Sequence, residues 1–133
     1  MKKRAHMIGA IIFAVLAYYM WHFLHRALFI PPDPSLHSTL TSILSMEVFL
    51  FFIMIFSSMF GGTLPDILDP PFTSHHRAFA HSKALLLVFT LAWLIALYVL
   101  LVGRSTMIWG LYFFLSGYIS HLLMDSRTPA GLQ

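Results

Sequence analysis

Residues 84–102 read ALLLVFTLAWLIALYVLLV, a run of 19 residues with no charged side chain. A helix of about 20 such residues crosses the hydrocarbon core of a bilayer. Three further stretches of the chain have a similar length and character: about 6–30, 40–60 and 107–124. Helix-ending residues follow the first three of the four stretches, namely Pro31, Gly61 and Gly103. The sequence therefore predicts an all-α integral membrane four-helix bundle, forming a single transmembrane domain over residues 1–133.

The composition of the chain agrees with this prediction. Of the 133 residues, 59% are hydrophobic and 10% are charged, whereas about a quarter are charged in an ordinary soluble domain. The mean hydropathy of +0.80 leaves too few polar side chains to cover a water-soluble core. The chain has no cysteine, which excludes disulfide bonds and thiolate metal sites. Its basic residues form no stripe of the kind that binds nucleic acid, so we expect no nucleic-acid partner.

The basic residues near the helix ends predict the orientation in the membrane. With four spans, the N-terminus, the connection at 61–83 and the C-terminus all lie on one side. That side carries six of the eight lysines and arginines: Lys2, Lys3, Arg4, Arg77, Lys83 and Arg127. The other side carries Arg26 and Arg104. Because cytoplasmic loops are enriched in lysine and arginine, we predict that both termini face the cytoplasm and that the chain resides in the cell (inner) membrane.

The predicted loop at 61–83 is the most polar stretch of the chain and contains two clusters. Asp66 and Asp69 lie three residues apart beside prolines, which restrict the backbone and would hold the two acids in one geometry. The alternative is a pair of solvated turn residues. His75, His76 and His81 place three histidines within seven residues. The alternative for this second cluster is a basic patch that contacts lipid headgroups.

A third cluster ends the fourth predicted helix. His121 and Asp125 are four residues apart in an apolar segment, a spacing that places both on one helix face. An imidazole and a carboxylate on one face are suitable ligands for a divalent metal such as zinc or manganese. A hydrogen-bonded pair that holds the helix end is the alternative, because buried polar groups need partners in any case.

An even number of spans brings these clusters, and the N-terminal His6, to the same membrane face. Polar residues at the edge of the hydrocarbon are functional by default. Seven residues are gathered there: His6, Asp66, Asp69, His76, His81, His121 and Asp125. One zinc ion takes about three or four protein ligands, so the set is large enough for one or two ions. Paired metals suit the hydrolysis of phosphate esters.

The same residues give the chain a resemblance to the YdjM-like family of LexA-regulated, membrane-bound metal-dependent hydrolases. The resemblance covers the whole chain in outline and is most specific in the last two polar clusters. The matching elements are His6, Gly61 or Gly62 through Pro65-Asp66, His76-Arg77-x-x-x-His81-Ser82, and Gly117-Tyr118-x-Ser120-His121-Leu122-Leu123-x-Asp125-x-x-Thr128-Pro129-x-Gly131. The family is regarded as related to zinc-dependent phospholipase C and single-strand nucleases, which implies a helical site with several His and Asp ligands.

The resemblance assigns roles to individual residues. It implies metal ligation by His6, Asp66, His76, His81, His121 and Asp125. Asp69 would be a further ligand or the general base, although the family commonly has its second acid two residues after the first, rather than three. Arg77 would stabilise the charge that develops on a phosphate, and Ser82, Ser120 and Thr128 would orient the ligands. One or two divalent ions, zinc or manganese, would activate water for hydrolysis.

The expected function is therefore a membrane-bound metal-dependent hydrolase of a phosphoester, such as a phospholipid, at the cytoplasmic membrane face. The alternative is a non-enzymatic membrane protein in which the metal or polar cluster is structural. A metal transporter would need a path of ligands across the bilayer, and His22, His25 and Glu47 offer only a broken one. A hydrogen bond between Glu47 and one of these histidines is favoured over a second site. The small interior of such a bundle is compatible with a homo-oligomer or a partner subunit.

Overall fold

The structure, a computed structural model, describes residues 2–29, 40–68, 80–103 and 106–127. These residues form four α-helices and no strand. In chain order the helices are α1 (Lys2–Phe29), α2 (Leu40–Leu68), α3 (Lys83–Val102) and α4 (Thr106–Ser126). Each is long and apolar enough to cross a membrane. The prediction of an all-α membrane protein with four spanning helices is confirmed.

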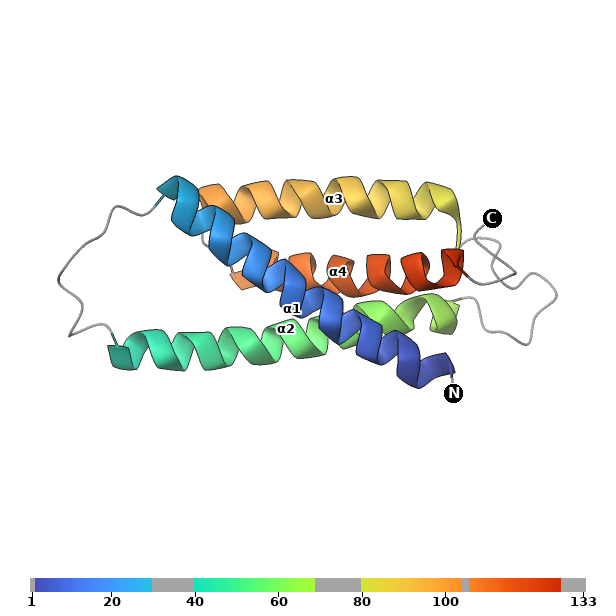
Figure 1. Ribbon diagram of the computed structural model, residues 1–133, viewed down its shortest axis with the longest axis horizontal. Helices are drawn as coiled ribbons and strands as arrows, with labels where there is room; N and C mark the ends of the chain where they lie inside the picture. Colours follow the sequence, from blue (N-terminus) through green and yellow to red (C-terminus); the bar gives the residue numbers. More distant parts are fainter. Residues whose placement is uncertain (1, 30–39, 69–79, 104–105, 128–133) are drawn as a thin grey trace.

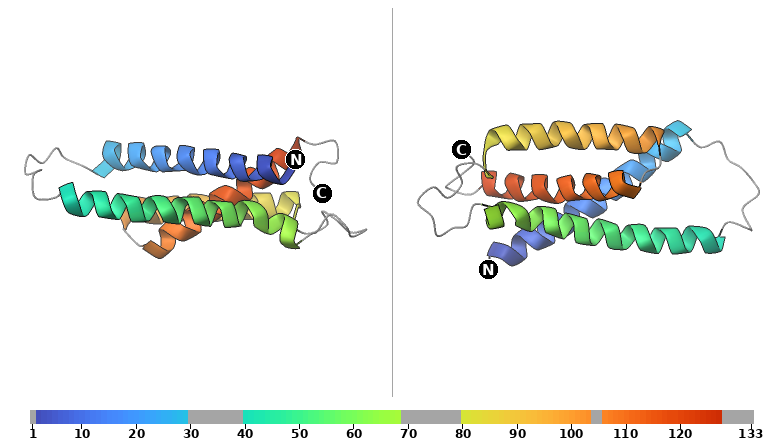
Figure 2. Two further views of the ribbon diagram at one scale, coloured as in Figure 1. Left: turned by 90° about the horizontal axis from the view of Figure 1, so that it is seen from below. Right: turned by 180° about the vertical axis from the view of Figure 1, so that it is seen from behind.

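The last helix, α4, lies at the centre of the arrangement (Figure 1). It packs against α1, α2 and α3, whereas α2 and α3 flank it and do not contact one another in the described part of the chain. Helix α1 crosses α4 obliquely, and the reverse view shows α4 between α2 and α3 with α1 behind it (Figure 2). The central position makes α4 the most buried of the four spans.

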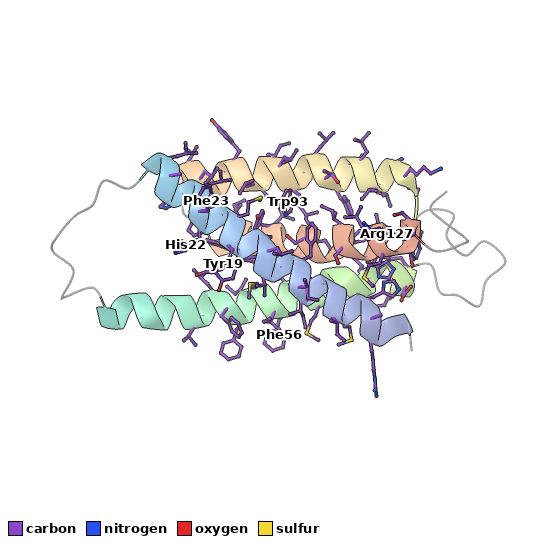
Figure 3. All side chains as sticks on the ribbon, viewed as in Figure 1. Tyr19, His22, Phe23, Phe56, Trp93 and Arg127 are labelled. Atoms are coloured by element: carbon purple, nitrogen blue, oxygen red, sulfur yellow. The ribbon has the colours of Figure 1, made fainter. Side chains whose placement is uncertain are left out.

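On α1, small residues face the interior and large apolar residues face outward. On α1 the inward stripe consists of Ala10, Ala14 and Ala17, which are 0–4% exposed. The outward stripe of the same helix is 56–71% exposed and consists of Ile8, Ile12, Leu16, Tyr19 and Phe23. Helix α2 likewise points Phe56 away from the bundle (Figure 3). Small residues let membrane helices approach closely, and the large exposed side chains are in the position to contact lipid.

The predicted end of the second helix at residue 60 is wrong, because α2 continues through Gly61, Gly62 and Pro65 to Leu68. The two glycines are sites of close helix packing instead of a stop signal. A Cβ on Gly61 would collide with the backbone of Phe114 on α4. Pro65 lies inside the helix and has no N–H to donate to the carbonyl of Gly61, and α2 ends three residues later at Leu68. Residues 61–68 of the predicted loop at 61–83 are therefore helical.

The other helix ends differ from the predicted ones by a few residues. Helix α1 spans 2–29 instead of 6–30, and α4 spans 106–126 instead of 107–124. Polar residues, which lie outside the apolar stretches, extend α1 at its start and α4 at both ends. Helix α3 spans 83–102 instead of 84–102 and has Ser82 as its N-cap, with the hydroxyl accepting a hydrogen bond from Leu85 N.

Four helix ends lie together at one end of the bundle (Figure 1). They are the first turn of α1, the last turn of α2, the first turn of α3 and the last turn of α4. The side of the membrane that this end faces stays a prediction from the distribution of basic residues.

Candidate metal centre

Five of the predicted site residues meet at this end of the bundle. Helix α1 contributes His6, α2 contributes Asp66 from its last turn, and α4 contributes His121 and Asp125. His81 comes from the turn that precedes α3. All five lie within two overlapping groups whose nitrogen and oxygen atoms could hold a metal ion.

Three donor atoms form a nearly equilateral triangle at the centre of the cluster. His81 Nε2 lies 3.2 Å from His121 Nε2 and 3.3 Å from Asp125 Oδ2. His121 Nε2 lies 3.5 Å from the same carboxylate oxygen. Two atoms bound at about 2.0–2.1 Å to one tetrahedral zinc ion lie about 3.3–3.4 Å apart. The three separations therefore match those of ligands around a single ion.

Asp66 supplies a fourth donor from a different helix. Its Oδ1 lies 3.6 Å from His121 Nε2 and 3.7 Å from His81 Nε2. The Asp66 side chain is 27% exposed, whereas the His81 side chain is fully buried. Asp66 thus borders the cluster on the side that solvent reaches.

The hydrogen bond at Nδ1 of His121 determines the tautomer of its imidazole ring. His121 Nδ1 lies 2.7 Å from the carbonyl oxygen of Gly62 on α2. A carbonyl only accepts, so Nδ1 carries the proton, and in the neutral ring Nε2 then carries the lone pair. This lone pair points toward the carboxylates of Asp66 and Asp125. Metal-binding histidines commonly donate their other N–H to a backbone carbonyl in this way.

His6 contacts both His121 and Asp125. Its ring stacks on that of His121, with centroids 4.1 Å apart and an angle of 24° between the planes. His6 Nε2 is 3.6 Å from Asp125 Oδ1, so the two oxygens of Asp125 face different histidines. His6 Nδ1 is buried and has no hydrogen-bond partner among the described residues.

The burial of the cluster makes its electrostatics unusual. His81 and His121 are 0% exposed, and Asp125 is 3% exposed. Lone pairs and negative oxygens repel one another, and burial removes the water that would screen them. A cation or shared protons between the donors would relieve this repulsion. The imidazole and carboxylate donors are those preferred by zinc and manganese, so the residues fit a divalent metal.

The remaining predicted site residues fall into two sets. Four lie outside the described part of the chain: Asp69, His76, Arg77 and Thr128. Ser82 and Ser120 are described. Ser82 caps α3 directly after His81, and Ser120 is buried on α4, facing Gly9 of α1. The orienting roles predicted for both serines stay predictions.

The contribution of Gly62, whose carbonyl accepts a hydrogen bond from His121, was not predicted from the sequence. A backbone acceptor has no side-chain signature, so only the close approach of α2 and α4 was open to prediction. The signal was the small residues Ser58, Gly61 and Gly62 at helical spacing on α2, opposite Gly117 on α4. Small residues at such spacing are typical of tight membrane helix pairs.

His22 and His25 do not join the cluster. They lie 16 and 19 residues after His6 on α1, which corresponds to about 24–28 Å along a helix. Figure 3 shows His22 at the other end of the molecule, and His25 stacks on Trp21 with ring centroids 4.9 Å apart. The side chain of Glu47, their predicted partner, lies outside the described residues.

Fold and cluster together define a four-helix membrane protein with a His/Asp group that could hold a metal ion. Searches of protein-family models, curated proteins and solved structures found no match to the chain.

Proposed function

We propose that this protein is a membrane-bound metal-dependent hydrolase that acts on a phosphoester, such as a phospholipid, at the cytoplasmic face of the cell membrane. The main support is the triangle of His81 Nε2, His121 Nε2 and Asp125 Oδ2, whose sides measure 3.2–3.5 Å. The sequence resemblance to the YdjM-like family of membrane-bound hydrolases supports the same function.

Zinc is the proposed metal, because the triangle has the size expected for tetrahedral ligands; manganese is compatible with the same donors. One ion would be held by His81, His121 and Asp125, and the fourth position, beside the more distant Asp66, would be shared between this carboxylate and water. Because His121 Nδ1 is engaged by Gly62, this residue offers only Nε2. A second ion would need His6 together with the predicted ligands His76 and Asp69.

A bound divalent metal would supply an activated water and a counter-charge for a phosphate group. The protein residues would hold the metal and surround it. His81, His121 and Asp125 exclude bulk water, because they are almost completely buried. Asp66, the exposed donor, marks the side from which substrate would approach. The roles of Asp69 as ligand or general base, and of Arg77 as a phosphate-binding residue, belong to the same proposal.

The charges around the site support an anionic substrate. Arg4, Lys83 and Arg127 are exposed at the helix ends that surround the cluster, and Figure 3 shows Arg127 at that end of the molecule. Cations at the rim of a site raise the local concentration of anions. A site at the end of membrane helices lies at the level of lipid headgroups, so a phospholipid is the simplest substrate.

The burial of the donors favours one alternative, a structural metal centre. Structural zinc sites are closed, whereas catalytic sites keep an open position. With His81 and His121 at 0% exposure and Asp125 at 3%, the ion would tie α2, α4 and the turn before α3 together without turnover. The partial exposure of Asp66 is the feature that favours catalysis.

The test begins with the full chain, purified in detergent without chelators. We expect stoichiometric zinc or manganese by elemental analysis, and release of phosphate or headgroup from phospholipid micelles. His121→Ala and Asp125→Ala should lose both metal and turnover. His22→Ala, a histidine substitution at the other end of α1, is the matched control and should retain both.

The outcomes separate the two readings. Metal without turnover of phospholipids or soluble phosphoesters would support the structural centre and overturn the hydrolase. A metal-free protein, purified under conditions that preserve metals and unable to bind added zinc, would overturn both.

A further inference from the structure

His81 differs from the other donors of the cluster in its backbone. His6, Asp66, His121 and Asp125 lie on helices, whose hydrogen bonds fix the backbone, but His81 lies in a turn. Its side chain is nevertheless fully buried and forms two of the three sides of the central triangle. Contacts outside a helix must therefore hold the backbone of this residue in place.

Two hydrogen-bonded anchors flank His81. On its N-terminal side, the hydroxyl of Tyr118 donates a hydrogen bond of 3.0 Å to the carbonyl oxygen of Ala80. On its C-terminal side, Ser82 caps α3 through its hydroxyl, and its carbonyl accepts a bond of 3.1 Å from Leu86 N. The first anchor connects the turn to α4, and the second connects it to α3.

We infer that Tyr118 is a positioning residue of the metal centre. It lies three residues before His121 on α4, so one helix supplies two donors and the anchor that sets the third. The ring of Tyr118 is 1% exposed and packs edge-on against Phe89 of α3, with centroids 4.5 Å apart. This packing fixes the hydroxyl, and the hydroxyl fixes the Ala80 carbonyl beside His81.

The anchor matters because metal binding tolerates only small errors in the positions of the ligand atoms. Ligand distances must lie within about 0.2 Å of their ordinary values for a site to bind metal well. Loss of the tether to α4 should let the turn, and His81 Nε2 with it, shift relative to His121 and Asp125. The inference rests on the proposed function only in taking His81 as a metal ligand.

Tyr112 provides a matched comparison on the same helix. It is 0% exposed, and its hydroxyl also donates a bond of 3.0 Å to a backbone carbonyl, that of Ala17 on α1. This bond lies in the apolar core, where Tyr112 packs among the residues around Trp109 and Phe113. Burial and bond length are thus the same for the two tyrosines, and only Tyr118 adjoins the cluster.

The experiment compares Tyr118→Phe with Tyr112→Phe in the full chain, in detergent. Each variant loses one buried hydroxyl. Zinc affinity, measured by competition with a chromophoric chelator, should fall about 10- to 100-fold in Tyr118→Phe, the range for residues that orient ligands. Tyr112→Phe should bind like the wild type. In the His81→Ala background, the further change Tyr118→Phe should have no effect on the remaining affinity, because the two residues act in one pathway.

A measurement on the metal-free protein tests the role of Tyr118 separately from the proposed hydrolase activity. Amide hydrogen exchange at residues 80–86 should be faster in Tyr118→Phe than in the wild type, and unchanged in Tyr112→Phe. Equal exchange in all three proteins would overturn the inference whether or not metal binds. Equal zinc affinity in the two variants would overturn it as well, with the hydrolase proposal intact. Failure of the wild type to bind zinc or manganese would overturn the proposed function and, with it, the role of Tyr118 in metal binding; hydrogen exchange would then test only whether Tyr118 holds the turn at His81.

Discussion

Each of the two carboxylate oxygens of Asp125 faces a different set of histidines. Its Oδ2 faces His81 and His121 at 3.3 and 3.5 Å, and its Oδ1 faces His6 at 3.6 Å. Asp66 contributes a single oxygen at longer distances of 3.6 and 3.7 Å and stays partly exposed. The two acids are therefore unequal: Asp125 is surrounded by imidazoles, and Asp66 closes the cluster from one side.

Because the two acids differ in this way, we expect their neutral variants to lose zinc affinity to different extents. Asp125→Asn removes the buried carboxylate from the central triangle. It should weaken zinc binding more than about 100-fold, which is the largest loss typical of a residue that only orients a ligand. Asp66→Asn keeps the triangle, so its loss of affinity should be smaller. Chelator competition on the two detergent-purified variants measures the difference. The reverse order would make Asp66 the principal carboxylate ligand.

At the scale of residues, the sequence predicted what helical periodicity determines. His121 and Asp125 were expected on one face from their spacing, and their facing atoms are 3.5 Å apart. The proximity of His6, Asp66 and His81 to this pair followed from an even number of spans. The stacking of His6 on His121 and the carbonyl of Gly62 did not follow, because they depend on helix crossing geometry. The ligand roles of these residues stay a prediction.

Among the elements, the pair α2 and α4 determines the geometry of the site. A Cβ on Gly61 would overlap the backbone of Phe114, and a Cβ on Gly117 would overlap the carbonyl of Ser58. Ser58 in turn donates a hydrogen bond of 2.7 Å to the carbonyl of Ala10 on α1. The two backbones therefore touch, and this contact brings Gly62 within reach of His121.

The same contact explains why the end of α2 was predicted wrongly. In sequence, the adjacent Gly61 and Gly62 have the pattern of a helix stop. In a membrane, glycine inside a helix is also the residue that permits backbone contact. The choice between these two uses depends on whether a partner helix is present. That partner is α4, which follows about 50 residues later in the chain, outside any local pattern.

Substitution of the interfacial glycines should separate α2 from α4. Gly117→Ala would force the backbones apart, and overpacking of this kind costs about 1–3 kcal/mol. The thermal midpoint in detergent should fall, and zinc affinity should fall with it as Gly62 moves away from His121. Gly110→Ala is the matched control on the same helix, because its Cβ would lie 3.8 Å from Ser57 Oγ, an ordinary contact. An equal response of the two variants would contradict this account of the interface.

Across the whole molecule, the polar residues of the cluster and the apolar surface occupy separate zones. Large side chains such as Phe23, Phe56 and Tyr98 cover the outside at 67–71% exposure, while the donors gather at one end. Helix α4 lies between α2 and α3 (Figure 2) and keeps three large apolar side chains exposed: Met107, Leu111 and Leu123. The predicted homo-oligomer or partner subunit stays a prediction, since lipid would cover these apolar surfaces equally well.

The orientation of the molecule is open to a direct test, because the chain contains no cysteine. Single cysteines can replace Ser126, exposed at the cluster end of α4, and Met107, which is 86% exposed at its other end. Because lysine and arginine are enriched on cytoplasmic sides, an impermeant thiol reagent should label Met107→Cys in intact cells. Ser126→Cys should react only after permeabilisation, and the cysteine-free protein gives the background. Labelling of Ser126→Cys in intact cells would reverse the orientation and place the cluster on the outer face, where a cytoplasmic substrate could not reach it.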